Sequence, residues 1–208
     1  MSELTDRSVI AEDKRRLILD AAVRVFAHKG FHTSRVGDIA KEAGVAHGLL
    51  YHYFSSKDEV LETIFKETWA EVLAAARMVE ETDEPARDRL SGIAKIMLRS
   101  WRRDPDLVRV LVREVTRGAH VQLETNEIEL AMQALQRIVE HGQRDGEFDG
   151  SVDGRLAAAI WYGALEEILT GWAFGQLPDA EEDVSRAEQA VVRIVAGGLA
   201  GDRAAAPA

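Results

Sequence analysis

Apolar residues along the chain recur mostly at intervals of three and four positions, which is the spacing of one face of an α-helix. The stretch over about residues 11–28 is typical, because Ile18, Ala22 and Val25 fall on one side of a helix there. No segment of useful length alternates apolar and polar residues as a half-buried strand does. The pattern therefore predicts an all-α fold.

Glycine, proline and small polar residues divide this pattern into nine predicted helices. Gly30 and Gly44 end the first two helices, and Pro85 and Pro105 open the fifth and the sixth. The first expected helix covers about 11–28. The second begins at a cap formed by Thr33 and Ser34 and ends at Gly44, the third covers about 46–53, and the fourth begins at a cap formed by Ser55 or Ser56. The remaining five cover about 85–103, 105–118, 123–144, 154–174 and 181–199.

Composition narrows the class of protein. The chain has 208 residues, of which 46% are hydrophobic and 30% charged, as in globular proteins with one large domain or two small ones. It has no cysteine, which excludes disulfides, thiolate metal sites and cysteine nucleophiles. The N-terminus lacks the apolar core of a signal peptide, and the longest apolar run, 156–165, is too short to span a bilayer. We expect a cytoplasmic protein without membrane contact.

The charge is uneven along the chain. The formal net charge is −10, yet residues 1–60 balance nine Lys and Arg against nine Asp and Glu. The whole negative excess therefore lies after residue 60. Such asymmetry suggests two functional regions, and the balanced N-terminal region permits contact with DNA without requiring it.

Residues 36–54 have the pattern of a helix-turn-helix. Two short predicted helices are joined by EAGVAHG at 42–48, and a tight turn containing glycine sets the second helix across the first. Ile39 and Ala40 are expected to anchor the first helix, and Leu50 and Phe54 the second. A helix this short needs neighbours to hold it, which leaves its outer face free for contact.

The outer face of that second helix combines rings, imidazoles and a glycine. Tyrosine hydroxyls and histidine nitrogens reach phosphate oxygens without much net positive charge, and a small residue such as Gly48 allows close approach. Leu49 can touch a thymine methyl group in the major groove. The expected outward residues are His47, Gly48, Leu49, Tyr51, His52 and Tyr53.

The stretch FHTSRVGDIAKEAGVAHGLLYHYFSSKDEVL, residues 31–61, resembles the DNA-binding signature of TetR-family transcriptional regulators. The resemblance rests on the Thr/Ser pair, the Ile-Ala pair, Gly44-Val45, Gly48, Tyr51, Phe54 and the Lys57-acid-acid-Val-Leu run, and it covers roughly residues 12–65. Gly37 departs from the family pattern, which often has a longer polar side chain there.

The resemblance implies a homodimer that binds operator DNA and a small apolar effector. We expect no cofactor, no metal and no catalytic residue. The resemblance also implies a helix-turn-helix head over 1–56 and an effector-binding and dimerisation body over 57–200. The small and polar residues of the tail at 201–208 are expected to be disordered. Carried over to this chain, the DNA-binding residues are Thr33, Ser34, Arg35, His47, Gly48, Leu49, Tyr51, His52, Tyr53 and Lys57.

Other classes of protein are less consistent with the residues. His47 and His52 are five apart, which is not the spacing of a helical zinc pair. Glu166 and Glu167 are adjacent, so their side chains diverge by about 100° on a helix and do not form an acid–base pair. A helical adaptor that binds only protein would not need the polar and aromatic face at 47–53.

The body suggests a pocket for a large apolar ligand, since all four tryptophans lie after residue 60. Ordinary core packing is the alternative for each residue. Residues 155–175 also resemble the TetR regulators of fatty-acid degradation that respond to acyl-CoA, whereas a multidrug or other metabolic regulator is the alternative function. The expected effector-binding residues are Met97, Trp101, Arg102, Trp161, Leu165, Ile168, Leu169 and Trp172.

Arginines recur in the fifth and sixth helices and have two interpretations. They could bind the phosphates of coenzyme A, or they could be solvated side chains that balance an acidic body. They are Arg99, Arg102, Arg103, Arg109, Arg113 and Arg117.

The last two helices are expected to form the dimer interface. Small residues around Ala164 permit close approach of helices, and the final helix carries an apolar stripe. The resemblance implies a four-helix interface, for which we select Ala164, Val191, Val192 and Val195.

Overall fold

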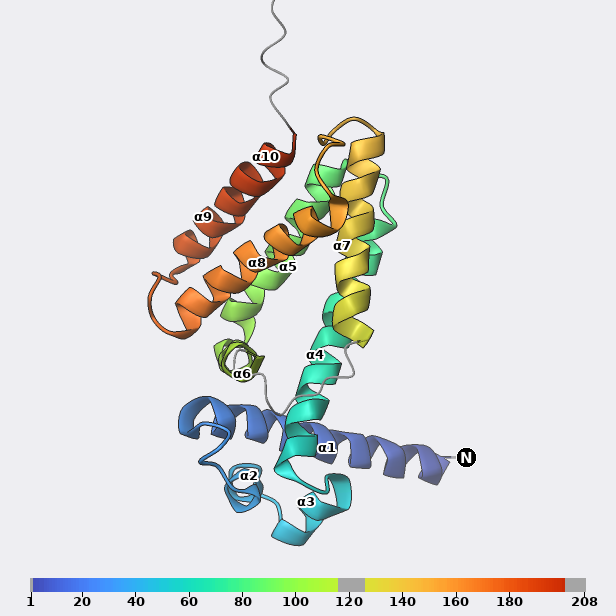
Figure 1. Cartoon of the computed structure of the whole chain (residues 1–208). Helices are drawn as coiled ribbons and strands as arrows, with labels where there is room; N and C mark the ends of the chain where they lie inside the picture. The colour runs from blue at the N-terminus through green and yellow to red at the C-terminus, as the bar shows by residue number, and fades with distance from the viewer. Residues whose placement is uncertain (1, 116–125, 201–208) are drawn as a thin grey trace, which may run out of the picture. The chain divides into compact units, whose positions relative to one another are not determined.

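The computed structural model describes residues 2–115 and 126–200, with side chains from 11 to 114 and from 128 to 200. Within these ranges every regular element is a helix (Figure 1), which confirms the all-α prediction. None of these helices is long and apolar enough to cross a membrane. The expected disordered tail at 201–208, and the junction of the sixth and seventh predicted helices at 116–125, lie outside the described residues.

The described elements follow the predicted order closely. In chain order they are α1 (Ser2–Lys29), α2 (Val36–Glu42), α3 (His47–Tyr53), α4 (Lys57–Glu80), α5 (Ala86–Arg103), α6 (Pro105–Val115), α7 (Asn126–Arg144), α8 (Gly154–Ala173), α9 (Glu181–Val191), the π-helical turn η1 (Val192–Ala196) and α10 (Gly197–Leu199).

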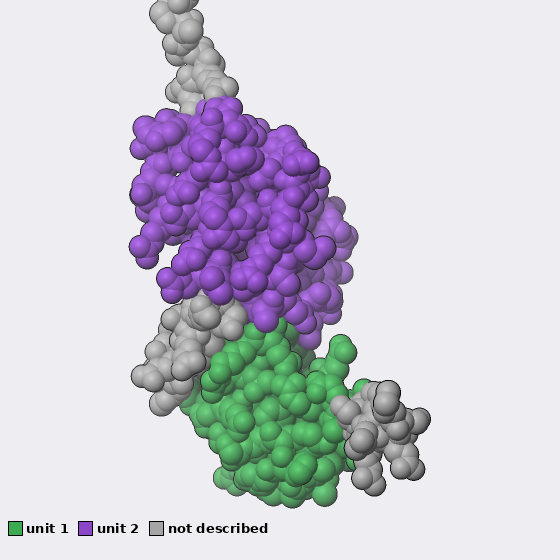
Figure 2. Space-filling model, turned by 90° about the vertical axis from the view of Figure 1, so that its right-hand side faces the viewer, with its two compact units in different colours: residues 1–67, 106–123 green, residues 68–105, 124–208 purple. Residues whose placement is uncertain are grey.

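Packing divides the chain into two compact units (Figure 2), which we call the head and the body. The head consists of residues 1–67 and 106–123, and the body of residues 68–105 and 124–208. The head thus contains α6 in addition to α1–α3 and the first part of α4. The predicted boundary between the DNA-binding and effector-binding regions at residue 56 stays a prediction, because packing divides the chain after residue 67 and adds residues 106–123 to the head.

Helix α1 begins at Ser2, about nine residues before the predicted start. The apolar spacing that guided the prediction starts only near residue 17, but a helix also extends through polar residues when no glycine or proline stops it. Its buried side includes Ile18, Ala22 and Phe26, and Phe26 meets Phe31 edge to face at 5.2 Å between ring centroids.

Helices α2 and α3 form the predicted helix-turn-helix. Each has seven residues, and α2 packs against both α1 and α3. Gly44 in the turn has φ +65°, a left-handed conformation that costs glycine little. Ile39, Leu50 and Phe54 are buried, as the sequence predicted.

The predicted cap of the second helix is wrong. Arg35 is the N-cap residue of α2, and its amide is bound by the Asp38 carboxylate at 2.7 Å. The hydroxyls of Thr33 and Ser34 instead donate to carbonyl oxygens behind them, those of Lys29 and Phe31. The physical reason is distance, because a cap must lie directly before the helix. The cap of α4 is as predicted, since Ser56 Oγ accepts from the Glu59 amide at 3.1 Å.

The body is built around α5, which packs against α7, α8 and α9, while α7 also packs against α8. Apolar side chains at helical spacing fill the space between them. Gly142 permits a close approach, because a Cβ atom there would lie 2.6 Å from the ring of Phe148. The fully buried large side chains of this core include Leu90, Leu98, Ile138, Val139, Trp161 and Leu165.

The last predicted helix, at 181–199, contains an irregularity. After α9 the chain makes one π-helical turn, η1, before a short α10. A π turn holds one residue more than an α turn and is rare in proteins. The apolar spacing of the sequence gave no sign of it.

Candidate functional site

Helix α3 has two distinct faces. Leu50 on α3 and Phe54 at its C-cap are buried in the head, whereas His47, Gly48, Tyr51 and His52 are exposed. Leu49 and Tyr53 are half-buried at the edges. Tyr51 exposes 51% of its surface although it is a large aromatic residue. The sequence therefore placed this face correctly, and its exposure leaves it open to a macromolecular surface.

Two ring contacts order the exposed face. The His47 and Tyr51 rings meet edge to face at 5.2 Å, and the His52 and Tyr53 rings at 5.3 Å. A Cβ atom added at Gly48 would meet nothing within 4 Å, so the backbone there is open to a partner. One added at Gly37 would lie 3.6 Å from the ring of His47, which is an ordinary van der Waals contact.

The predicted contacts before α2 differ in accessibility. Thr33 and Arg35 are exposed. Ser34 exposes only 3% of its surface, and its hydroxyl donates to the Phe31 carbonyl at 2.7 Å. In this structure Ser34 holds the loop together and does not present its hydroxyl to a partner.

Lys57 also has a structural role that the sequence did not reveal. Its ammonium donates to the carbonyl oxygens of Phe31 at 2.8 Å and Ser34 at 3.2 Å. It also lies 4.5 Å from the centroid of the Phe31 ring, in a cation–π contact. The positive charge is thus used to close the loop between α1 and α2.

Helix α6 is bound to the end of α1 within the head. Arg113 donates to the carbonyl oxygen of Ala27 at 2.9 Å, at the C-terminal end of α1, where a cation is favourable. His28 lies 3.1 Å from a carboxylate oxygen of Asp106. Sequence reasoning assigned this segment to the body, and no local signal identified its partner.

Three predicted effector residues of the body are buried tryptophans with different hydrogen bonding. Trp101 donates to Asp179 at 3.1 Å, and Trp172 donates to the carbonyl oxygen of Pro178 at 2.9 Å. The two rings lie 6.3 Å apart. Both therefore hold the α8–α9 connection in place, as core residues do.

Trp161 is different. It is fully buried, and its indole N–H is the one buried side-chain polar group in the described part of the chain that has no hydrogen-bond partner. An unpaired buried donor is costly, which sets Trp161 apart from the other two tryptophans. Leu165 and Leu169 are buried on the same helix, and Ile168 and Met97 are half-buried.

Helix α8 also carries two acidic groups, Tyr162 and Glu166, whose pKa values are raised. Burial raises the pKa of Tyr162 far above its ordinary value, with a smaller contribution from the charge of Glu166. Burial, and then the charge of Glu167, raises the pKa of Glu166. The Tyr162 ring packs on Trp69 at 6.0 Å between centroids. These groups lie in an apolar environment that disfavours charge.

Most of the arginines that the sequence suggested as phosphate ligands form ion pairs with acidic side chains of the same chain. Arg99 and Arg102 pair with Glu188 and Glu181 of α9, at 2.7 and 3.4 Å. Arg103 lies 3.6 Å from Glu71, and Arg109 lies 2.9 Å from Asp106. Arg117 lies outside the described residues. The interpretation of these side chains as balancing charges therefore has direct support in the structure.

Both parts of the chain match known protein families. Residues 18–64 match bacterial regulatory proteins of the tetR family, and residues 65–198 match the C-terminal region of YsiA-like proteins. The chain belongs to the TetR family of transcriptional regulators.

Several TetR-family relatives control fatty-acid metabolism. The fatty acid metabolism regulator protein of Bacillus subtilis (strain 168) is 32% identical over 187 residues, or 88% of this chain and 93% of that protein. The structure of FadR from Bacillus subtilis in complex with stearoyl-CoA has a TM-score of 0.79 and 28% identity, covering 88% of this chain and 98% of that one. The fatty acid degradation regulator FadR from Bacillus halodurans has the same TM-score and identity, covering 89% and 96%.

TetR-family regulators bind operator DNA and form dimers, and the relatives of this chain are regulators rather than enzymes. On α8 and the segment after α9, Leu156, Ile160 and Ile194 expose 56%, 54% and 72% of their surface. Among the residues selected for the interface, Ala164, Val192 and Val195 are partly exposed, but Val191 is buried within its own chain. Among the described residues, no group of His, Asp and Glu is arranged to hold a metal.

Proposed function

We propose that this chain is a transcriptional repressor that binds a near-palindromic operator as a homodimer and is released by a long-chain acyl-CoA. The proposal assigns it to the control of fatty-acid metabolism genes. The single observation that carries the DNA-binding part is the exposed face of α3, the second helix of the helix-turn-helix, on which Tyr51 and His47 are accessible to a DNA groove.

In this proposal α3 is the recognition helix. His47, Gly48 and Leu49 contact base edges, and Tyr51, His52 and Tyr53 contact phosphates, as the N-terminal part of a recognition helix enters the major groove. Arg35, the N-cap of α2, and Thr33 in the loop before it are exposed, and the proposal gives them phosphate contacts as well. Lys57 supports this surface through the loop that it closes.

The effector assignment rests on the body. The relative crystallised with stearoyl-CoA covers nearly the whole chain. The unpaired N–H of Trp161 supplies a donor among apolar side chains, and the carbonyl oxygen of a thioester would accept from it. A ligand of this kind combines a long apolar chain with one buried acceptor.

Release requires that the effector bind more tightly to a conformation that fits DNA poorly. A ligand with equal affinity for both conformations shifts nothing, however tightly it binds. In a dimer, DNA binding depends on the distance between two recognition helices, which must match about one helical turn of DNA, roughly 34–36 Å. A change in that distance is enough to lower operator affinity.

The experiment is a mobility-shift assay on the promoter region of the chain's own gene, followed by titration of the complex with acyl-CoAs of graded length. Each buried methylene contributes about 0.8 kcal/mol, so the concentration needed for release should fall about fourfold per methylene until the pocket is full. Release by an unrelated apolar compound, with none by any acyl-CoA, would favour a multidrug or other metabolic regulator instead.

A further inference from the structure

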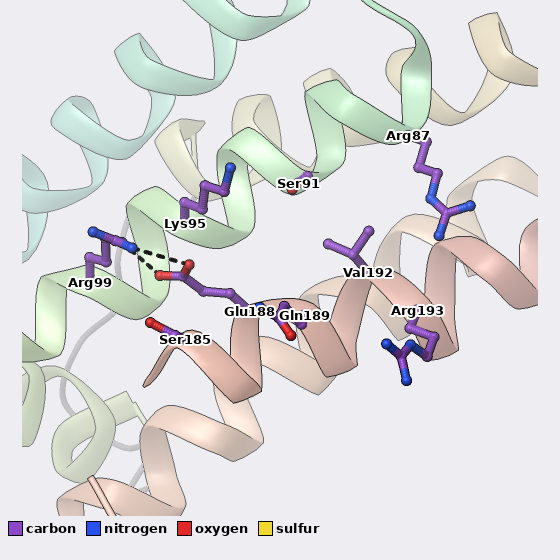
Figure 3. A pocket seen from close by; sticks show the side chains of 9 residues that line it. All are labelled: Arg87, Ser91, Lys95, Arg99, Ser185, Glu188, Gln189, Val192 and Arg193. Atoms are coloured by element: carbon purple, nitrogen blue, oxygen red, sulfur yellow. Dashed lines mark hydrogen bonds and ion pairs between the residues drawn. The ribbon is translucent and has the colours of Figure 1, made fainter. Parts of the chain in front are cut away.

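A charged groove lies between α5 and the segment formed by α9 and η1 (Figure 3). Its volume is about 490 Å³. Arg87, Lys95 and Arg99 line it from α5, and Arg193 lines it from η1. The one carboxylate in the lining is that of Glu188, and serine and glutamine side chains complete the walls. Four cations thus face one anion in the most acidic part of the chain.

The single carboxylate is already neutralised. Arg99 binds both oxygens of Glu188, at 2.7 and 3.4 Å. Glu188 exposes only 6% of its surface, and a buried carboxylate needs such a partner. The same hydrogen bond and charge raise the pKa of Arg99. The pair joins α5 to α9 and leaves no net negative charge in the groove.

The other three cations are not used in this way. Within the described residues, no ion pair involves the side chains of Arg87, Lys95 or Arg193. The neighbouring arginines Arg102 and Arg103, by contrast, each have an acidic partner. All three line the same groove, so the groove carries positive charge that no acid of the described chain balances.

The π turn gives independent support. Val192 and Arg193 line the groove and are the first two residues of η1. The extra residue of a π turn changes which side chains face α5, and such turns are found frequently at functional sites.

We propose that this groove binds the phosphate groups of an organic phosphate of nucleotide size. Guanidinium groups bind phosphate oxygens in a bidentate manner, and a lysine ammonium adds a point charge. The volume falls in the usual range of small-ligand sites, about 300–1,000 Å³. The phosphates belong either to the coenzyme A part of the acyl effector or to a separate nucleotide. The proposal that the groove binds phosphate does not depend on the assignment of an acyl-CoA effector.

The test is isothermal titration calorimetry of the full chain with free coenzyme A and with ATP at low ionic strength, since salt screens exposed charges. We expect Lys95→Gln/Arg193→Gln to weaken binding of these ligands at least tenfold. The matched control is Arg77→Gln/Arg144→Gln, which removes the same charge from two exposed arginines of the body outside the groove. The control should bind as the wild type does, and Lys95→Arg/Arg193→Lys should retain binding.

Two positive outcomes distinguish the source of the phosphates. Coenzyme A that binds more tightly than ATP and is displaced by stearoyl-CoA places the effector's own phosphates in the groove. ATP that binds as tightly and is not displaced indicates a separate nucleotide. The proposal is overturned if the wild type binds neither ligand, or if the Lys95→Gln/Arg193→Gln variant binds like its control. If acyl-CoAs fail to release the operator, the effector assignment is wrong, but the calorimetric test of phosphate binding in the groove remains valid.

Discussion

The ammonium group of Lys57 donates a 2.8 Å hydrogen bond to the carbonyl oxygen of Phe31, twenty-six positions earlier in the chain. The same group lies over the Phe31 ring at 4.5 Å. Lys57 begins α4, and Phe31 lies in the loop before α2, so this contact fixes the start of the helix-turn-helix to α4. A residue that the family resemblance assigns to DNA contact therefore also holds the DNA-binding surface in shape.

Replacing Lys57 by Met should destabilise the head. The change keeps the apolar stem and removes the charged donor, and a hydrogen bond to a charged group contributes about 1.5–3 kcal/mol. We expect a lower melting temperature and weaker operator binding together. Lys14→Met, at an exposed position of α1, is the control and should leave the melting temperature unchanged. A Lys57→Met protein of wild-type stability with weakened operator binding would show that Lys57 acts on phosphate alone.

Tyr51→Phe should separate DNA contact from stability. The hydroxyl is on the exposed side of α3, and the ring contact with His47 survives the change. Loss of a hydrogen bond to a charged phosphate costs about 1.5–3 kcal/mol, so operator affinity should fall at least about tenfold. The salt dependence should not change, because no charge is removed. Unaltered operator affinity in a titration by fluorescence anisotropy would remove Tyr51 from the interface.

Much of the head could be predicted from sequence because its information is local. Gly44 needs a left-handed backbone, and Leu50 and Phe54 fall on the apolar side of a short helix, so the turn and the exposed face of α3 followed directly. The role of Lys57 could not be predicted, because its partners lie more than twenty positions away and are backbone oxygens. Any residue type supplies such oxygens, so the sequence carries no sign of them.

Glu166 should make the stability of the body depend on pH. Burial raises its pKa in the folded chain, so between the unfolded and folded pKa values the native state binds more protons than the unfolded state. Stability should therefore fall as pH rises through that window and stay lower above it. Glu166→Gln should remove this fall and raise stability at neutral pH.

Urea unfolding at a series of pH values measures the effect of Glu166. Glu81→Gln is the matched control, since Glu81 is an exposed carboxylate of the same unit. If the free energies of unfolding of Glu166→Gln and of the wild type run parallel over the whole pH range, ionisation of Glu166 does not destabilise the folded chain, which would contradict the prediction.

Ile194→Asp should yield monomers. Ile194 exposes 72% of its surface in the single chain, so an aspartate there is tolerated by the fold but would be desolvated in an interface formed by α8 and α9. Met78→Asp is the control, because Met78 is 73% exposed on α4. Sedimentation velocity should show monomers for Ile194→Asp and dimers for Met78→Asp. A dimeric Ile194→Asp protein would place the interface elsewhere.

The body shows where sequence reasoning fails. The apolar spacing predicted an apolar stripe along the last helix. The π turn at Val192–Ala196 changes which residues of that stripe face inward, so that Val191 is buried while Ile194 is exposed. The charged groove was missed for a similar reason. Lys95 and Arg193 are almost a hundred positions apart, and only the packing of α5 against α9 and η1 brings them to one surface.

Control of operator binding by a long-chain acyl-CoA is tested by the affinity for the operator with and without stearoyl-CoA. Fluorescence anisotropy with a labelled operator gives both dissociation constants on the same protein, and calorimetry confirms that stearoyl-CoA is bound. We expect saturating stearoyl-CoA to raise the dissociation constant of the operator complex at least about fivefold, the lower end of typical allosteric coupling. An unchanged dissociation constant with stearoyl-CoA bound would contradict it.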